Sequence, residues 1–321
     1  MPSQRMTSAN RCGPKPANAG SSGTKPNACV AASSASSTRP CAASASARTR
    51  RRRSSWTVHA ERGKSSVRFE AIARAGVRRI TGTHEIVEAD KTLRRDVALA
   101  NRIIERCGLS NVFGHASARI PGTDTFLFPR RRSPGFAEEN HLLVIDTDGN
   151  VRTGVGTPNS ELWIHARIYA SRPDIGGIVH AHPMACICLS QIGEPFRIVH
   201  NQGGAFAAGV AEYDPIGLIR TRELGDQLVR CLGSAVGVIM RGHGITTATA
   251  DIRSATVAAC FLEEGARLQL QMLAAAGGDA GRIRAYTREE ADRVSDQLSP
   301  AIVARAWEYY AAVAEVRSLG G

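Results

Sequence analysis

An apolar run that carries two histidines one residue apart, His180 and His182 within residues 175–183, constrains this chain most. Side chains alternate along a strand, so both imidazoles face the same side, about 6–7 Å apart. A third histidine, His243, is flanked by glycines in residues 241–244. Two parallel imidazoles and one from a turn can hold a divalent cation and leave a coordination position open. The pair alone is equally compatible with ordinary histidines at a strand end.

A carboxylate precedes the paired histidines by about twenty residues. Residues 158–171 have the pattern of a helix, and Glu161 lies in its first turn. A helix that leads into the neighbouring strand can bring this carboxylate over the strand end, as a fourth ligand or as a base beside a metal. His165 shares the face of Glu161 and is interpreted as a core or supporting histidine rather than a ligand. Taken alone, Glu161 would be a solvated carboxylate favoured by the helix dipole.

The basic charge of the chain is confined to its N-terminal region. Residues 1–80 hold sixteen Lys and Arg but only Glu61 and Glu70 as acids, and the net charge of +14 there leaves −2 for the remaining residues of a +12 chain. A near-neutral body excludes specific nucleic-acid recognition by the folded part. Residues 1–85, rich in Ser, Ala and Arg, are predicted to be a disordered tail. An upstream start codon chosen too early is the preferred explanation; a transit peptide or a polyanion-binding arm are the alternatives.

The number of cysteines and the absence of a long apolar run indicate the cellular compartment. Five cysteines lie beyond the tail, an odd number in a body long enough for a full core, which favours a reducing environment over a disulfide framework. No run of eighteen apolar residues occurs, so neither a membrane nor secretion is indicated. The expected location is the cytoplasm, or an organelle if the tail is a genuine transit peptide.

Residues 86–321 are predicted to form one α/β domain, a central mixed sheet flanked by helices. Helices are expected over 93–107, 158–171, 184–192 and 251–275. Asp251 is the expected N-cap of the last of these, and Thr287 opens a capping box further on. Strands are expected over 117–120, 125–128, 142–146, 175–182 and 236–240.

Five segments, taken together and in order, resemble the class II aldolase/adducin family. They are Gly114-His115-Ala116-Ser117-Ala118-Arg119, Asn159-Ser160-Glu161 with His165, Ala170-Ser171-Arg172-Pro173-Asp174, Val179-His180-Ala181-His182-Pro183 and Arg241-Gly242-His243-Gly244. The resemblance runs from about Asp96 to about Gly277. It is specific because several independent motifs agree.

The resemblance implies a three-layer α/β/α fold and a homotetramer with sites at subunit interfaces. It also implies a metal held by His180, His182 and His243, with Glu161 as the catalytic acid/base that can also ligate the metal. Zn²⁺ is the first choice for this donor set, and Mn²⁺, Co²⁺ or Fe²⁺ also suit it. A second acid, often a tyrosine in the family, is not assigned to any residue here.

The expected substrate differs from that of the sugar-phosphate aldolases. Their neutral phosphate cradle is replaced in part by His115 and by an arginine cluster around Arg130 and Arg132, while Asn159 and Ser160 stand at the remaining positions. Guanidinium groups pair bidentately with carboxylates, although they also bind phosphate. The loop over residues 126–134 resembles that of the family's decarboxylases for carboxylated muconic semialdehydes. Without such a role the arginines would be a solvated loop.

Three functions follow as hypotheses. The first is a metal-dependent carbon–carbon lyase that decarboxylates a carboxylated oxo or hydroxy acid, a small molecule of the aromatic ring-fission type, through a metal-stabilised enolate. The second is a fuculose-phosphate-like aldolase. The third is a non-enzymatic, adducin-like interaction module, against which the retained Glu161 and three histidines argue.

Overall fold

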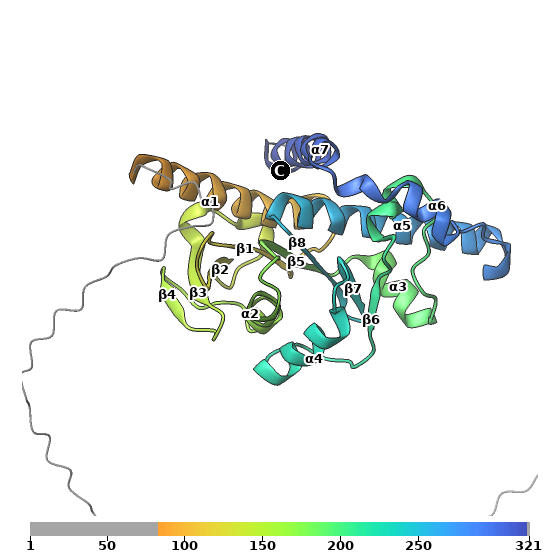
Figure 1. Cartoon of the computed structure of the whole chain (residues 1–321), viewed down its shortest axis with the longest axis horizontal. Helices are drawn as coiled ribbons and strands as arrows, with labels where there is room; N and C mark the ends of the chain where they lie inside the picture. Colours follow the sequence, from red (N-terminus) through yellow and green to blue (C-terminus); the bar gives the residue numbers. More distant parts are fainter. Residues whose placement is uncertain (1–82, 320–321) are drawn as a thin grey trace, which may run out of the picture. The chain divides into compact units, whose positions relative to one another are not determined.

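An eight-stranded mixed sheet forms the middle layer, in the order β4-β3-β2-β1-β5-β8-β7-β6 (Figure 1). The computed structural model describes residues 83–319, and their side chains from 90 to 316. Within this part of the chain the neighbouring strands are antiparallel except for the parallel pair β6 and β7. The strands are β1 (His115–Arg119), β2 (Thr125–Pro129), β3 (Leu142–Asp146), β4 (Val151–Thr153), β5 (Gly177–Ala181), β6 (Ala211–Tyr213), β7 (Gly237–Met240) and β8 (Gly244–Thr249).

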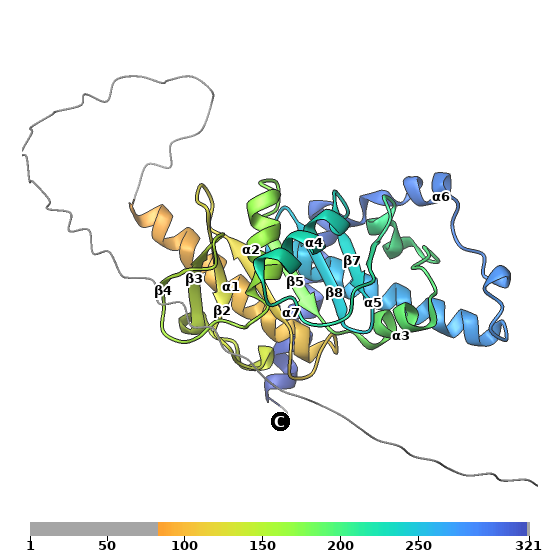
Figure 2. The ribbon, with the colours of Figure 1, turned by 90° about the horizontal axis from the view of Figure 1, so that it is seen from below.

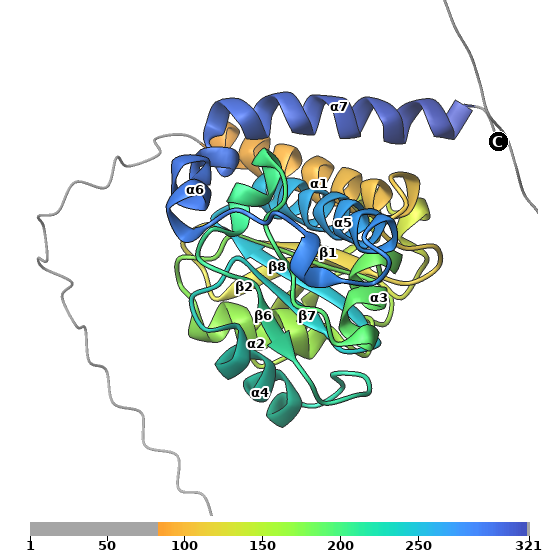
Figure 3. The same ribbon diagram turned by 90° about the vertical axis from the view of Figure 1, so that its right-hand side faces the viewer.

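Helices cover both faces of the sheet. One face packs against α1 (Thr83–Arg106), α3 (Met184–Ile192) and α5 (Ile252–Ala275), and α7 (Pro300–Leu319) lies across the outer side of α1 and α5 (Figure 3). The other face packs against α2 (Leu162–Ser171) and α4 (Arg222–Leu232), which lie in front of the sheet in Figure 2. The short helix α6 (Arg288–Arg293) precedes α7. This arrangement confirms the predicted three-layer α/β/α fold.

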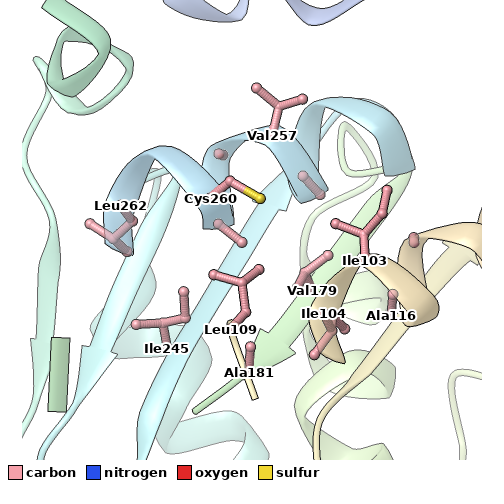
Figure 4. Packing of buried hydrophobic residues seen from close by; sticks show 14 of the residues in the cluster. Ile103, Ile104, Leu109, Ala116, Val179, Ala181, Ile245, Val257, Cys260 and Leu262 are labelled. Atoms are coloured by element: carbon pink, nitrogen blue, oxygen red, sulfur yellow. The ribbon is translucent and has the colours of Figure 1, made fainter. Parts of the chain in front are cut away.

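Strand β5 shows how the sequence divides its side chains between the two layers. Val179 and Ala181 belong to the core under α1 and α5 (Figure 4), whereas Ile178 belongs to the core under α2 and α4. All five residues of β5 are buried, as expected for a strand in the middle of a sheet covered on both sides. His180 alternates with Val179 and Ala181, so it faces the α2 layer together with Ile178.

A polar row crosses the three central strands on the α2 face. His115 of β1 is directly opposite His180 of β5, and His180 is directly opposite Thr246 of β8. Opposed residues on neighbouring strands have their Cβ atoms about 4.5–5.5 Å apart. All three side chains are buried. The sheet register therefore places polar groups side by side inside an otherwise apolar layer.

Most of the predicted elements are present. The strand at 142–146 and the helix at 184–192 have the expected bounds, Asp251 accepts a hydrogen bond from Ser254 N, and Thr287 forms the capping box with Glu290. Helix α1 begins at Thr83, ten residues earlier than expected. Strands β4, β6 and β8 and helix α4 were not predicted.

Of the tail predicted to be disordered over residues 1–85, residues 1–82 lie outside the described part, whereas residues 83–85 form the start of α1, so the predicted boundary was three residues too late. Among the helices that the structure describes, none combines the length and the apolar character that crossing a bilayer requires.

Candidate metal centre

Four side chains meet where β5 ends and β8 begins. His180 is the fourth residue of β5, His182 follows that strand directly, and His243 directly precedes β8. Because β5 and β8 are antiparallel, with Ala181 opposite Ile245, the end of one strand and the start of the other lie at the same edge. Glu161 reaches the same place from the first residue before α2. Segments more than eighty residues apart in the sequence thus converge on one point.

The donor atoms of the four residues fit a divalent cation. They all lie within 4.8 Å of one another. His180 Nε2 is 3.0 Å from His182 Nε2 and 3.9 Å from Glu161 Oε2, and His243 Nε2 is 3.5 Å from Glu161 Oε1. Ligand atoms about 2.1 Å from a tetrahedral ion are about 3.4 Å apart. Both ring nitrogens of His243 are buried without a hydrogen-bond partner, and a metal bound at Nε2 would account for one of them.

A neighbouring hydroxyl orients the ring of His180. The Nδ1 atom lies 3.2 Å from Thr246 Oγ1, whose hydroxyl donates in turn to the sulfur of Met240 at 3.7 Å. With its own proton directed to the sulfur, the Thr246 oxygen accepts from Nδ1–H. The Nε2 lone pair of His180 is therefore left free toward the cluster, the tautomer that a metal ligand needs.

Backbone contacts hold Glu161 in place. Its Oε1 atom accepts a hydrogen bond of 2.9 Å from Ile219 N, and its own N–H donates to Asn159 Oδ1 at 3.0 Å. Burial raises the pKa of Glu161, but the contact with His243 and the Ile219 N–H outweigh burial and leave the pKa below its usual value. The carboxylate is thus ionised at neutral pH, as a ligand or base must be.

Glycines shape the turn that carries His243 and the entry of the chain into β1. Gly242 has φ +63°, a left-handed conformation in which the turn can present His243. Gly114 has φ +117°, and a Cβ atom there would lie 3.1 Å from the carbonyl oxygen of His180. The chain can therefore enter β1 close against β5.

His115 and His165 lie behind the ligands. His115 Nδ1 is 2.7 Å from His165 Nε2, and His165 Nδ1 is 2.6 Å from Ser117 Oγ. Burial lowers the pKa of His115 to about 4; the charge of Glu161 opposes this effect and the other histidines add to it. Burial likewise lowers the pKa of His182 to about 4 and the pKa of His180 well below its usual value. The rings of His115, His180 and His182 are therefore neutral at pH 7.

These buried rings predict a loss of stability in acid. His115 has a pKa near 6.5 in an unfolded chain and about 4 when folded, so its contribution is fully present above pH 6.5 and is lost as the pH falls toward 4. The expected loss from this ring alone is about 3 kcal/mol. Chemical denaturation of the metal-free protein between pH 8 and pH 4 measures it. The His115→Gln variant, which lacks this titrating ring, should show a shallower slope in that window, and equal slopes would contradict the prediction.

A cavity of about 940 Å³ opens over the cluster. Glu161, His182 and His243 form part of its lining, together with Val112, Phe113, Gly114, Arg131, Arg132, Ser133, Asn159, Ser160, Gly217, Leu218, Arg220 and Gly242. The lining thus combines the ligands with three guanidinium groups and an apolar wall. Two contacts with residues outside the lining hold its neighbouring arginines in place. Arg131 N donates to Thr157 O at 2.7 Å, and Arg132 Nη1 lies 3.3 Å from His141 Nε2.

The structure brings some of the predicted substrate residues to this cavity and not others. Asn159, Ser160 and Arg132 line it. Arg130 does not, because its side chain lies against Gly156, where a Cβ atom would be 3.1 Å from it. His115 is 1% exposed and lies beneath the cavity floor rather than on it. Arg220 was missed, since an isolated arginine between β6 and α4 carries no local signal.

Comparisons with known proteins identify the family of the chain. The model of the family described as "Class II Aldolase and Adducin N-terminal domain" matches residues 95–270. The 3,4-dihydroxyphthalate decarboxylase of Arthrobacter keyseri is 32% identical over 200 residues, which cover 57% of this chain and 80% of the relative. An L-fuculose phosphate aldolase of Methanococcus maripaludis is 30% identical over 161 residues, covering 50% and 85% respectively.

The fold has a counterpart among solved structures. An aldolase II superfamily protein from Pseudomonas syringae superposes with a TM-score of 0.62 at 24% identity, covering 71% of this chain and 94% of that protein. At this identity the likeness concerns the fold.

Proposed function

The chain belongs to the class II aldolase and adducin family, and on that premise we propose that it is a metal-dependent decarboxylase of a small carboxylated hydroxy or oxo acid. The observation that carries the proposal is a complete Glu161, His180, His182 and His243 cluster next to a cavity that is lined in part by arginines. Relatives of this family are decarboxylases and aldolases, so the chain is a carbon–carbon lyase.

The charge of the cavity favours a substrate with carboxylate groups. Arg131, Arg132 and Arg220 line it, and Glu161 is the acidic side chain among the lining residues described. Guanidinium groups bind a planar carboxylate through two parallel hydrogen bonds. Phe113 and Leu218, both largely exposed at the cavity, offer apolar surface to a ring or an unsaturated chain. A diacid with two adjacent oxygens, either an aromatic vicinal diol or its ring-fission product, matches both features.

The histidines, Glu161 and the arginines have separate roles in the proposed decarboxylation. The three histidines and Glu161 would hold a divalent cation, which when bound supplies Lewis acidity for the negative charge that develops as the carbon–carbon bond breaks. Glu161, ionised at rest, takes a proton from a substrate hydroxyl and returns it to the carbon that loses CO₂. The electron pair of the broken bond is delocalised toward the oxygen next to that carbon until the proton forms the new C–H bond, and solvent reprotonates the hydroxyl that Glu161 had deprotonated. The arginines orient the carboxylate that remains.

Product analysis tests this proposal. Purified full-length protein supplied with Zn²⁺ or Mn²⁺ is incubated with vicinal-diol aromatic diacids, 2-oxo diacids and ketose phosphates. Release of CO₂ from an acid supports the decarboxylase. Aldehyde release from a ketose phosphate instead would favour the aldolase alternative, to which the fuculose phosphate aldolase relative points. Inactivity on every compound, with one metal bound per chain, would contradict the proposed substrate class.

Arginines that line the cavity, compared with one that does not, provide a matched test of carboxylate binding. We expect Arg132→Ala and Arg220→Ala each to raise KM for the acid by roughly 10- to 150-fold, because a hydrogen bond to a charged group contributes about 1.5–3 kcal/mol. Arg130→Ala is the control, since Arg130 does not line the cavity. Steady-state kinetics measure all three variants. An unchanged KM in Arg132→Ala and Arg220→Ala would remove these arginines from carboxylate recognition.

A further inference from the structure

A chain of four buried side chains leads to the back of the metal centre. Tyr169 OH lies 2.9 Å from Ser117 Oγ, Ser117 Oγ lies 2.6 Å from His165 Nδ1, and His165 Nε2 lies 2.7 Å from His115 Nδ1. None of the four residues is more than 2% exposed. The chain ends at His115 Nε2, which is closed off from solvent and has no hydrogen-bond partner. Buried polar atoms are almost always paired, so this atom requires an explanation.

The chain has a preferred direction. If Tyr169 donates to Ser117, Ser117 donates to His165 Nδ1, and His165 Nε2–H then donates to His115 Nδ1. Every proton between Tyr169 and His115 then has an acceptor, and His115 carries its remaining proton on Nε2. In the reverse direction Ser117 would donate to Tyr169, and two buried groups would then lack a partner, the O–H of Tyr169 and the Nε2 lone pair of His115; the first direction leaves only the Nε2–H of His115. The first direction is therefore favoured, and it makes His115 Nε2 a hydrogen-bond donor.

The groups around His115 indicate which acceptor its Nε2–H can bind. His115 is paired across the sheet with His180, and the two ring centroids are 5.0 Å apart. His165, which lies on the Nδ1 side of His115, is in the first turn of α2, four residues after Glu161, which directly precedes that helix. The charge of the Glu161 carboxylate raises the pKa of His115, against the effect of burial. Since His115 does not line the cavity, it can act on a substrate only through a neighbouring group.

We propose that His115 is a positioning residue for Glu161: its Nε2–H, fixed as a donor by the chain from Tyr169, hydrogen-bonds the Glu161 carboxylate when that side chain turns from the ligand cluster to the substrate. In the present arrangement Ile219 N holds Oε1, and Oε2 faces His180. The proposal rests on the proposed function in one respect, namely that Glu161 carries the proton. The donor direction of the chain does not depend on it.

Two amide variants separate this role from a packing role. Glutamine places an amide nitrogen near the position of Nε2 in histidine, and asparagine places an amide near that of Nδ1. His115→Gln can therefore keep the donor toward Glu161, whereas His115→Asn keeps only the partner of His165. We expect kcat for decarboxylation to fall by about 10- to 100-fold in His115→Asn with KM little changed, and His115→Gln to recover most of it.

Readouts that do not depend on turnover accompany the kinetics. Metal affinity and melting temperature are measured for both variants, and both are expected to stay close to the parent protein. If His115→Asn keeps the parent kcat, or if both variants lose it equally with metal affinity and stability intact, the positioning role is overturned. A loss of kcat that follows a loss of metal affinity or of melting temperature also overturns it, because the residue would then be structural.

Nitrogen-15 NMR of histidine-labelled, metal-free full-length protein tests the donor direction itself. We expect His115 and His165 to carry their protons on Nε2 in the parent, and Tyr169→Phe to mix the two tautomers because it removes the donor at the far end. A His115 proton on Nδ1 in the parent would overturn the proposal whatever the substrate proves to be. If the tautomer is as expected but the parent releases no CO₂ from any acid, the proposed function fails and the donor direction stands.

Discussion

The His182→Ala variant should purify as a folded protein that no longer retains a divalent cation. His182 lies just beyond the end of β5, is partly exposed to the cavity, and contributes one of the three imidazole nitrogens of the cluster. Its removal should weaken metal binding by more than the roughly 10–100-fold that the loss of an outer partner of a ligand costs. Lewis-acid assistance provides several kcal/mol, so turnover should fall by roughly a thousandfold or more.

Elemental analysis after gel filtration measures this effect and identifies the metal. The parent should contain about one divalent ion per chain, as expected of one four-ligand cluster. His200→Ala is the matched control, because His200 is half-buried like His182 but lies outside the ligand cluster. The metal centre is refuted if His182→Ala binds as much metal as His200→Ala does.

The Glu161→Gln variant should keep the metal and lose the reaction. Glutamine preserves the shape of the side chain and an oxygen that can accept from Ile219 N, but it cannot take up a proton. General acid–base groups contribute typically 10²–10⁴-fold, and kcat should fall within that range. The three histidines remain, so metal content should stay near the parent value. This separation of binding from turnover distinguishes Glu161 from His182.

Single-turnover and steady-state kinetics on the acid identified by product analysis test this expectation. Glu223→Gln, which replaces an exposed carboxylate at the start of α4, is the control and should be as active as the parent. A Glu161→Gln enzyme with the parent kcat would assign the proton transfer to another group. A variant that loses its metal together with its activity would make Glu161 chiefly a ligand.

Local patterns explain which parts of the site could be recognised from the sequence. The alternation of side chains along a strand is a property of adjacent residues, and it sufficed to place His180 and His182 near each other. The glycines around His243 mark a turn in the same local way. The helix start at Glu161 was visible from Pro158 and Asn159.

The remaining features depend on which strands become neighbours. The pairing of His115 with His180 joins residues sixty-five positions apart, and no local pattern reveals that register. Strand β8 was missed because its threonines suggest a polar segment, yet all six of its residues are buried between two layers. Arg220 lies in a loop whose path depends on the packing of α4. The role of His115 could be seen only when His165 and Ser117 were placed around it.

The cross-strand row of His115, His180 and Thr246 also affects how the chain folds. These residues come from strands that pair only after loops of about sixty residues have closed, and such non-local pairings slow folding. A slip of one residue between β1 and β5 would turn His115 and Ser117 toward the α1 layer. Cation binding therefore becomes available only to chains that have completed the central pairings in the correct register. The ion would select for correctly assembled molecules at the last stage of folding, and would slow their unfolding thereafter.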